Sequence, residues 1–295
     1  MNVNRKYKDS VFTALFNDPD LLRELYCALG NVSLPKDIPV SINTLKNVLY
    51  MDFYNDISFE IGGKFVVLIE HQTTVNPNMA LRFLLYISRV LEKIIKSKTM
   101  YSTKKVEIPR PEFYVLYNGP KPFPDNAVFK LSDLFKRYDN LGLPEDSFPM
   151  LELEVKVINI NEGRNAEILN RCQKLSEYSK FMGKVNSYRS ELKNLEEAVE
   201  KAIKYCEKYD ILKEFLEIHG SEVLNMLLEE WNMDDALAVA REEAWEEGRE
   251  EERKEGDKKL HAEKLTIARN ALAKGSTPEF VHEITGLSLE EIAKL

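Results

Sequence analysis

The chain has 295 residues, of which 44% are hydrophobic, and carries a net charge of −8. This length suits one large domain with a smaller appendage, and this composition excludes a chain that is mostly disordered. No apolar run reaches the roughly 18 residues of a membrane span, so we expect no membrane partner.

The cysteines, the histidines and the N-terminal residues indicate where the protein works. Three scattered cysteines and four isolated histidines have no zinc-ligand spacing and form no disulfide framework. The first residues lead into a polar helix rather than an apolar signal segment. Together these features favour a reducing cytoplasm.

The negative charge is concentrated in the C-terminal part of the chain. Residues 1–185 hold 25 Lys and Arg against 22 Asp and Glu, a net charge of +3. Residues 186–295 hold 16 against 27, a net charge of −11. The acidity of the whole chain therefore does not argue against nucleic-acid binding by its N-terminal part.

The first predicted elements are helices, followed by a hairpin. Residues 5–30 have apolar side chains at helical spacing, and Pro19 breaks or restarts the helix. A connecting segment then leads to a predicted β-hairpin in residues 54–74, which turns at Gly62-Gly63.

The hairpin carries one carboxylate near the start of its first strand, Asp56, and another at the end of its second, Glu70. Unpaired charge is costly in a buried strand, so acids placed in this way usually face a cleft, a cation or a metal. The two acids share a face of the sheet if the loop has three residues, Ile61-Gly62-Gly63, and lie on opposite faces if it has two. Either glycine can adopt the left-handed conformation that a three-residue loop requires, so we expect the longer loop.

Two acids on one face are what a magnesium-dependent nuclease requires. Phosphodiester hydrolysis uses a divalent ion that polarises the phosphoryl oxygen and lowers the pKa of the attacking water, and one or two carboxylates hold Mg²⁺. We expect Asp56 and Glu70 to be those ligands, with the backbone carbonyl of His71 as a third. Gln72 lies two residues beyond Glu70 on the same strand face, where it would position the water. An ordinary hairpin with two solvated acids fits the spacing equally well.

Residues 79–96 predict an amphipathic helix with a basic side. At 100° per residue, four basic residues fall within about 60° of one another: Arg82, Arg89, Lys93 and Lys96. Solvation alone explains many charged helix faces. The uniform sign of this one, and its place directly after the acids, favour contact with DNA phosphates.

Further strands are predicted at residues 112–118 and 150–160, and a helix at residues 162–182, which indicates an α/β core. From residue 187 onward only helices are predicted. Residues 192–209 and 211–228 are amphipathic and are followed by a highly charged helix in residues 234–274. Gly220 is the expected break within the second of these helices.

The last segment contains a short predicted helix–turn–helix. Thr277-Pro278 carries the signal of one helix start, and Ser288 with Glu291 forms the capping box of the next. Recognition helices are usually basic, whereas the final helix is acidic. We therefore expect this tail to serve self-association rather than DNA recognition.

Four motifs of the chain resemble the recombination-promoting nuclease (Rpn) family, which is also labelled "putative transposase". The motifs are Tyr7–Phe16, Asn55-Asp56, Leu68–Thr73 and Phe113–Gly119. The family falls within the PD-(D/E)xK nuclease superfamily, and Gln72 stands in the place of the usual lysine. The resemblance covers about residues 5–185 and continues weakly through the helical tail.

The resemblance implies a restriction-endonuclease-like α/β core, with a mixed central sheet flanked by helices, followed by an all-helical C-terminal tail. It also implies a metal-dependent DNA endonuclease linked to recombination or mobile elements, with Asp56, Glu70 and Gln72 in the active site. Asp9 matches a position where members of the superfamily often keep a further acid, and it joins the catalytic set.

Glu154-Val155-Lys156 competes with the hairpin as a nuclease tripeptide, because it contains the lysine that the hairpin lacks. No Asp precedes it at comparable spacing, so we interpret it as an ordinary half-exposed strand. Lys156 remains a candidate to line the site and to serve as the lysine equivalent in place of Gln72.

We therefore expect a nuclease core in residues 1–185, a helical extension in residues 186–240, and a charged helix with a helix–turn–helix-like tail in residues 241–295. The expected function is a DNA endonuclease that uses a divalent metal, Mg²⁺ first. The alternative is a non-catalytic DNA-binding or assembly protein on a degenerate nuclease fold. The expected partners are DNA and, through the tail, further copies of the chain.

Overall fold

The structure is a computed structural model that describes residues 10–43, 56–95, 101–136, 149–192 and 194–295. The chain divides into two compact units, Met1–Glu230 and Trp231–Leu295. Two predicted site residues, Asp9 and Lys96, lie outside the described residues.

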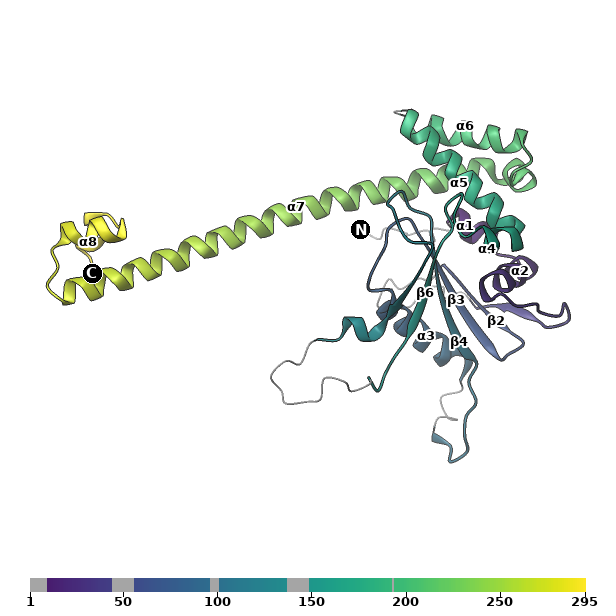
Figure 1. Cartoon of the computed structure of the whole chain (residues 1–295), viewed down its shortest axis with the longest axis horizontal. Coiled ribbons are helices and arrows are strands. Elements are labelled where there is room, and N and C mark those ends of the chain that lie inside the picture. Colours follow the sequence, from purple (N-terminus) through teal and green to yellow (C-terminus); the bar gives the residue numbers. More distant parts are fainter. Residues whose placement is uncertain (1–9, 44–55, 96–100, 137–148, 193) are drawn as a thin grey trace, which may run out of the picture. The chain divides into compact units, whose positions relative to one another are not determined.

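A six-stranded mixed sheet forms the centre of the first unit (Figure 1). In spatial order its strands are β1 (Val40–Ile42), β2 (Ile57–Ile61), β3 (Phe65–Gln72), β4 (Arg110–Tyr117), β6 (Glu154–Asn159) and β5 (Asn126–Lys130). β3, β4 and β6 run parallel, whereas β1, β2 and β3, and likewise β5 and β6, pair antiparallel. Parallel neighbours require a crossover, and α3 (Met79–Ile94) lies between β3 and β4 in the chain.

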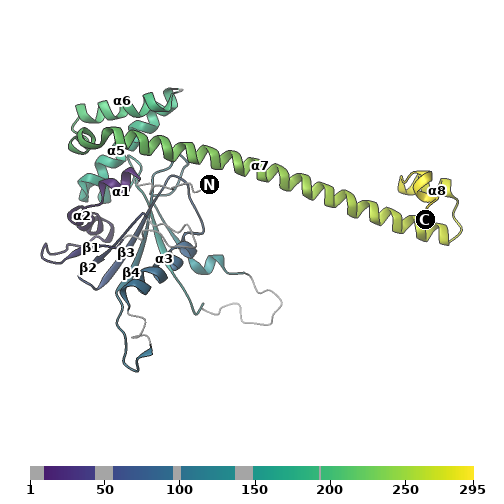
Figure 2. The same cartoon turned by 180° about the vertical axis from the view of Figure 1, so that it is seen from behind.

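Helices cover both faces of this sheet. The described residues of the first unit also form α1 (Val11–Leu15), α2 (Pro19–Gly30), α4 (Ala166–Arg171), α5 (Gln173–Glu191), α6 (Leu195–Lys208), the first part of α7 (Lys213–Ala273) and the 3₁₀ helix η2 (Leu131–Leu134). α3 lies on one side of the sheet, and α1, α2 and α4 lie on the other (Figures 1 and 2). The mixed sheet, its flanking helices and the helical C-terminal region confirm the predicted fold class.

Alternation along the central strands gives each face its own core. Val66, Leu68 and Val115 point toward α3, where Phe83 and Tyr86 pack against them. The residues between them point toward the opposite face, because successive side chains of a strand alternate.

The hairpin loop has three residues, as predicted, but the register differs. Ile61 pairs with Phe65, so the loop is Gly62-Gly63-Lys64 rather than Ile61-Gly62-Gly63. Gly62 and Gly63 have φ of 56° and 65°, which glycine adopts at low cost. Ile61 is only 3% exposed, so burial of its side chain favours a place in the strand. Compared with the expected loop, each residue of β2 pairs with a residue two positions further along β3. Because side chains alternate with a period of two residues, both acids stay on one face.

Two helix predictions were wrong in detail. Residues 162–182 form two helices, α4 and α5, and α5 extends past residue 185. Gly220 breaks nothing, because α7 (Lys213–Ala273) is continuous through it. One glycine costs a helix only about 1 kcal/mol, and Gly220 contacts Ile203 at an ordinary packing distance. The domain boundaries expected at residues 185 and 240 stay predictions.

The second unit contains α8 (Pro278–Thr285) and α9 (Leu289–Ile292), which follow the last part of α7. Both predicted caps are present: the Thr277 side chain accepts from the Phe280 N–H, and Ser288 forms the capping box with Glu291. A small core of buried side chains joins these helices, namely Ala268, Val281, Leu287 and Ile292. Across the described residues, no helix is both long and apolar enough to cross a membrane.

Candidate active site

The candidate site lies where β3 ends. Glu70 and Gln72 alternate with His71 along this strand, so the first two point toward α3 and the His71 ring points toward the other face. Glu70 is 3% exposed, an unusual position for a carboxylate. A buried acid at a strand end needs a compensating partner.

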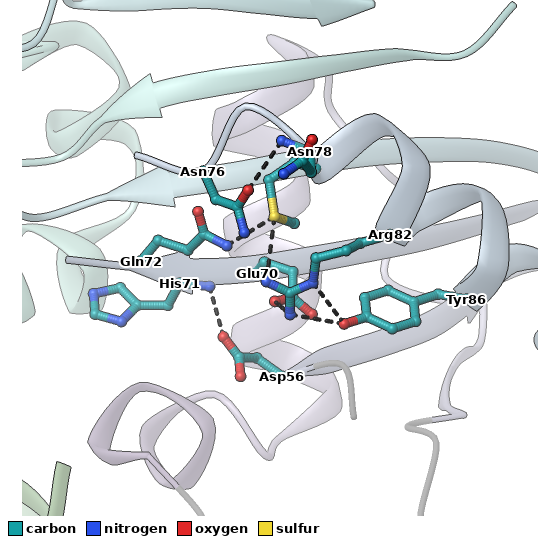
Figure 3. Close-up of polar contacts among 9 residues, drawn as sticks. Asp56, Glu70, His71, Gln72, Asn76, Asn78, Arg82 and Tyr86 are labelled. Atoms are coloured by element: carbon teal, nitrogen blue, oxygen red, sulfur yellow. Dashed lines mark hydrogen bonds and ion pairs between the residues drawn. The ribbon is translucent and has the colours of Figure 1, made fainter. Parts of the chain in front are cut away.

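Asp56 lies across from Glu70 at the neighbouring strand. Ile57 pairs with Ile69, and this register places Asp56 opposite Glu70. The backbone N–H of His71 donates to Asp56 Oδ2 at 2.7 Å (Figure 3). Burial raises the pKa of Asp56 to about 6, although this hydrogen bond and the charge of Arg82 act in the opposite direction. We call Asp56 and Glu70 the acid pair.

Glu70 is held by an ion pair with α3. Arg82 Nη2 lies 3.0 Å from Glu70 Oε2, and the same guanidinium donates twice to Tyr86 Oη, from Nε at 3.0 Å and from Nη2 at 2.7 Å (Figure 3). Burial raises the pKa of Glu70 well above its ordinary value, the charge of Asp56 raises it further, and Arg82 lowers it. The register brings the two carboxylates close enough for the charge of Asp56 to raise the pKa of Glu70.

Glu70 Oε1 and Gln72 Oε1 are buried in the site and have no hydrogen-bond partner among the residues that the structure describes. The Gln72 amide is fixed at its other end, because Nε2 donates to Met79 Sδ at 2.8 Å. Buried acceptors without donors are rare and call for a cation or a water. A divalent ion that prefers oxygen ligands fits the acid pair together with these oxygens.

The site has few side chains that could bind a metal, and their number limits which metal fits. Within the described residues, no group of three or more His, Cys, Asp and Glu side chains has metal-binding proximity. Two carboxylates nevertheless suffice for Mg²⁺, which keeps several waters. The prediction that the His71 carbonyl is a third ligand stays a prediction.

The His71 ring has a separate environment on the opposite face of the sheet. It stacks on Phe12 with ring centroids 5.2 Å apart, and its Nε2 lies 3.2 Å from Tyr178 Oη. Burial lowers the pKa of His71 to about 4, so the ring is neutral. These contacts from α1 and α5 hold the backbone whose N–H binds Asp56. The sequence motif around Phe12 contained this residue, but nothing in the spacing indicated the contact.

The predicted basic side of α3 does not stay together. Arg82 turns inward to Glu70, with its side chain 33% exposed. Arg89 is exposed and pairs with Glu92 at 2.8 Å, and Lys93 is exposed. Arg82 therefore belongs to the candidate site, and Arg89 and Lys93 remain as candidates for DNA contact. Sequence reasoning did not predict the roles of Met79 and Tyr86, although both share with Arg82 a helical spacing of three or four residues.

Lys156 does not face the acid pair. Lys156 pairs with Tyr114, and Tyr114 pairs with Ile69. Since paired residues share a face and Ile69 precedes Glu70, Lys156 points to the face opposite to Glu70. Its Nζ lies 5.4 Å from the centroid of the Tyr114 ring, and its side chain is exposed. The interpretation of residues 154–156 as an ordinary strand fits this geometry, whereas the suggestion that Lys156 lines the site was wrong.

The fold and the site together define a protein with a nuclease-like α/β core and two acids that lie opposite each other at the ends of neighbouring strands. The family described as "Putative transposase, YhgA-like" matches residues 9–203, and the "Rpn/YhgA-like nuclease family, C-terminal HTH domain" matches residues 261–295. The first match covers more than half of the chain, which therefore belongs to the Rpn/YhgA-like family. No curated protein and no solved structure matches it.

These matches confirm the predicted resemblance and the helix–turn–helix at the C-terminal end. The match over residues 9–203 continues past residue 185, into the helical part where a weaker resemblance was expected. It includes α5, which carries the Tyr178 contact to His71.

Proposed function

We propose that the chain is a metal-dependent DNA endonuclease, with Mg²⁺ as its natural ion, that acts in recombination or in the movement of mobile elements. The observation that carries this proposal is the acid pair. Two carboxylates share one face of the sheet at the ends of neighbouring strands, where burial raises the pKa of each. Perturbed acids brought together in this way are typical of functional sites.

The residues have distinct roles in this proposal. Asp56 and Glu70 hold the ion through their carboxylate oxygens, and the His71 N–H orients Asp56. When bound, Mg²⁺ supplies polarisation of the phosphoryl oxygen and a lower pKa of the attacking water. Gln72 orients that water through Oε1, since Met79 holds the other end of the amide. Asp9 is proposed as a further acid.

DNA binding is proposed at two places, one on α3 and one in the second unit. On α3, exposed Arg89 and Lys93, together with Lys96, would contact backbone phosphates. In the second unit, the helix–turn–helix of α8 and α9 would bind DNA, as the match to an HTH domain favours.

Nicking of supercoiled plasmid tests the proposed function. Wild-type protein should nick the plasmid with Mg²⁺ or Mn²⁺ and be inactive in EDTA. Glu70→Gln keeps an acceptor for Arg82 but removes the charge, and should be inactive. Arg164→Ala is the matched control, because it removes an exposed arginine that pairs with Asp125 at 3.2 Å. Equal nicking by wild type and Glu70→Gln would exclude the assignment.

A second function is favoured by one contact. Arg82 already neutralises Glu70 at 3.0 Å, and Gln72 supplies no charge, as expected of a non-catalytic protein on a degenerate nuclease fold. Such a protein would bind DNA with the same affinity in EDTA and in Mn²⁺, and would release no heat on Mn²⁺ titration. Calorimetry with Mn²⁺ therefore separates the two functions before any cleavage assay.

A further inference from the structure

Phosphodiester hydrolysis requires positive charge beside the reacting phosphate, and this site has few sources of it. Water adds across one P–O bond: its oxygen bonds to phosphorus, and the leaving sugar oxygen takes the bonding electron pair and a proton. Negative charge builds on the phosphate oxygens during this exchange, and fixed donors stabilise it. Gln72 is neutral, and Lys156 faces away from the acid pair.

Arg82 is the cation that the fold brings to this place. In the parts of the chain that the structure describes, no other Lys or Arg side chain forms an ion pair with Asp56 or Glu70. Its guanidinium is anchored on two sides, by Glu70 at 3.0 Å and by the buried hydroxyl of Tyr86. Met79 Sδ lies 3.5 Å from Arg82 Nη1, and the same sulfur accepts a hydrogen bond from Gln72 Nε2. Figure 3 shows Arg82 between Glu70 and Tyr86.

The donors of this guanidinium are only partly used. Arg has five N–H donors in a planar fork. Nε and Nη2 bind Tyr86 and Glu70, and Nη1 has one weak contact with sulfur. One Nη1 hydrogen therefore has no hydrogen-bond partner among the residues that the structure describes, and one third of the side chain is open to solvent. A phosphate oxygen can reach this donor.

We propose that Arg82 is a catalytic residue that donates from Nη1 to a non-bridging oxygen of the scissile DNA phosphate, taking the place that a lysine at position 72 would fill. Tyr86 and Met79 are positioning residues: Tyr86 binds the guanidinium, and Met79 contacts both the guanidinium and the Gln72 amide. The proposal rests on the proposed nuclease function and assigns to Arg82 a role beyond general phosphate contact.

Steady-state nicking by the full-length protein with saturating Mn²⁺ tests this role. Arg82→Ala should lower kcat about 100-fold and change KM less than about threefold, because the lost donor acts in the transition state. Arg82→Lys keeps the charge and should lose less, about tenfold. Millimolar guanidinium should restore part of the activity of Arg82→Ala and none of Glu70→Gln. Arg89→Ala is the comparator for a residue that only binds DNA, and should raise KM while kcat stays the same.

Manganese titration gives a readout that does not depend on activity. Arg82→Ala should bind Mn²⁺ at least as tightly as wild type, since removing a cation beside Glu70 lessens the repulsion of the ion. Weaker Mn²⁺ binding would show a structural role and overturn the proposal. A raised KM at unchanged kcat would make Arg82 a DNA contact and would overturn it as well.

The nuclease function and the role of Arg82 fail in different ways. If wild type nicks and Glu70→Gln does not, while Arg82→Ala nicks at the wild-type rate, only the role of Arg82 is overturned. If wild type does not nick under any metal condition, both proposals are overturned.

Discussion

The backbone N–H of His71 donates to Asp56 Oδ2 at 2.7 Å, so the residue that follows one acid holds the other. The ring of the same residue packs on the opposite face of the sheet against Phe12 and Tyr178. His71 thus links the acid pair to α1 and α5. The acids therefore depend on packing that lies outside the site.

Replacing the acids by their amides should abolish nicking and preserve the fold. Asn at position 56 still accepts from the His71 N–H, and Gln at position 70 still accepts from Arg82. We expect a loss of at least about 100-fold for each variant. The thermal midpoint in EDTA at neutral pH should be equal to or above that of wild type, because each change removes a carboxylate whose ionised form is disfavoured by burial. A variant that is both inactive and unfolded would contradict this account.

The acid pair should make the metal-free protein less stable as the pH rises from about 4 to 7, whereas the lowered pKa of the buried His71 ring acts in the opposite direction over the same range. The pKa of Asp56 is raised from 3.8 to about 6, and that of Glu70 is raised as well, so in this range the folded state binds more protons than the unfolded state. This contribution to stability is complete below the unfolded pKa and is lost as the pH passes the folded pKa. We expect the thermal midpoint in EDTA to fall by about 5 °C over this range relative to a variant whose residues 56 and 70 do not titrate.

The double variant Asp56→Asn with Glu70→Gln is the control for this pH dependence, since neither amide titrates. The midpoint of wild type should fall relative to that of the double variant, because the other groups of the chain, His71 included, titrate in both proteins. Identical pH profiles for wild type and the double variant would show that the acid pair is not the source.

Gln72→Lys should preserve or raise the nicking rate, because an ammonium stabilises developing negative charge that an amide only orients. The gain should be small in wild type, where Arg82 is present. In the Arg82→Ala background the same change should recover about tenfold of the lost rate, which makes the two changes non-additive. A double variant no faster than Arg82→Ala would mean that position 72 does not reach the phosphate.

Gly119→Ala should destabilise the core. A Cβ at this position would lie 1.8 Å from the Thr73 carbonyl oxygen and 2.6 Å from Tyr117 Oη, and a backbone oxygen cannot move aside cheaply. We expect a loss of at least about 2 kcal/mol in the free energy of unfolding, measured by urea denaturation. Gly220→Ala is the matched control within α7, where the nearest atom is 3.8 Å away, and it should gain about 1 kcal/mol.

The helix–turn–helix retains apolar surface after its own core has formed. Phe280, Ile284 and Leu289 remain 52%, 50% and 50% exposed. We predict that this surface serves self-association, so the double change Phe280→Asp and Ile284→Asp should lower the mass of the full-length protein in light scattering. Nicking should remain detectable. An unchanged mass with lost DNA affinity would show instead that these apolar side chains serve the DNA binding proposed for the helix–turn–helix and not self-association.

Much of the fold follows from patterns that are local in the chain. Whether Asp56 and Glu70 share a face of the hairpin depends only on the loop length and on the two-residue period of a strand. The caps at Thr277 and Ser288 are also local, since each side chain bonds to a backbone N–H three residues away. The exact loop residues were less accessible, because burial of Ile61 against the rest of the sheet decides them.

The chemistry around the acids depends on contacts that no local pattern encodes. Helical spacing placed Arg82 on a basic side of its helix, yet packing of the apolar face of α3 against the sheet turns this arginine to Glu70. Sheet register likewise decides that Lys156 faces away, since one residue of shift along a strand exchanges the two faces. Sequence alone determined the acids, the strand face that they share and the family. Tertiary structure decided which cation meets them, because long-range burial sets the angle at which a helix face reaches a strand end.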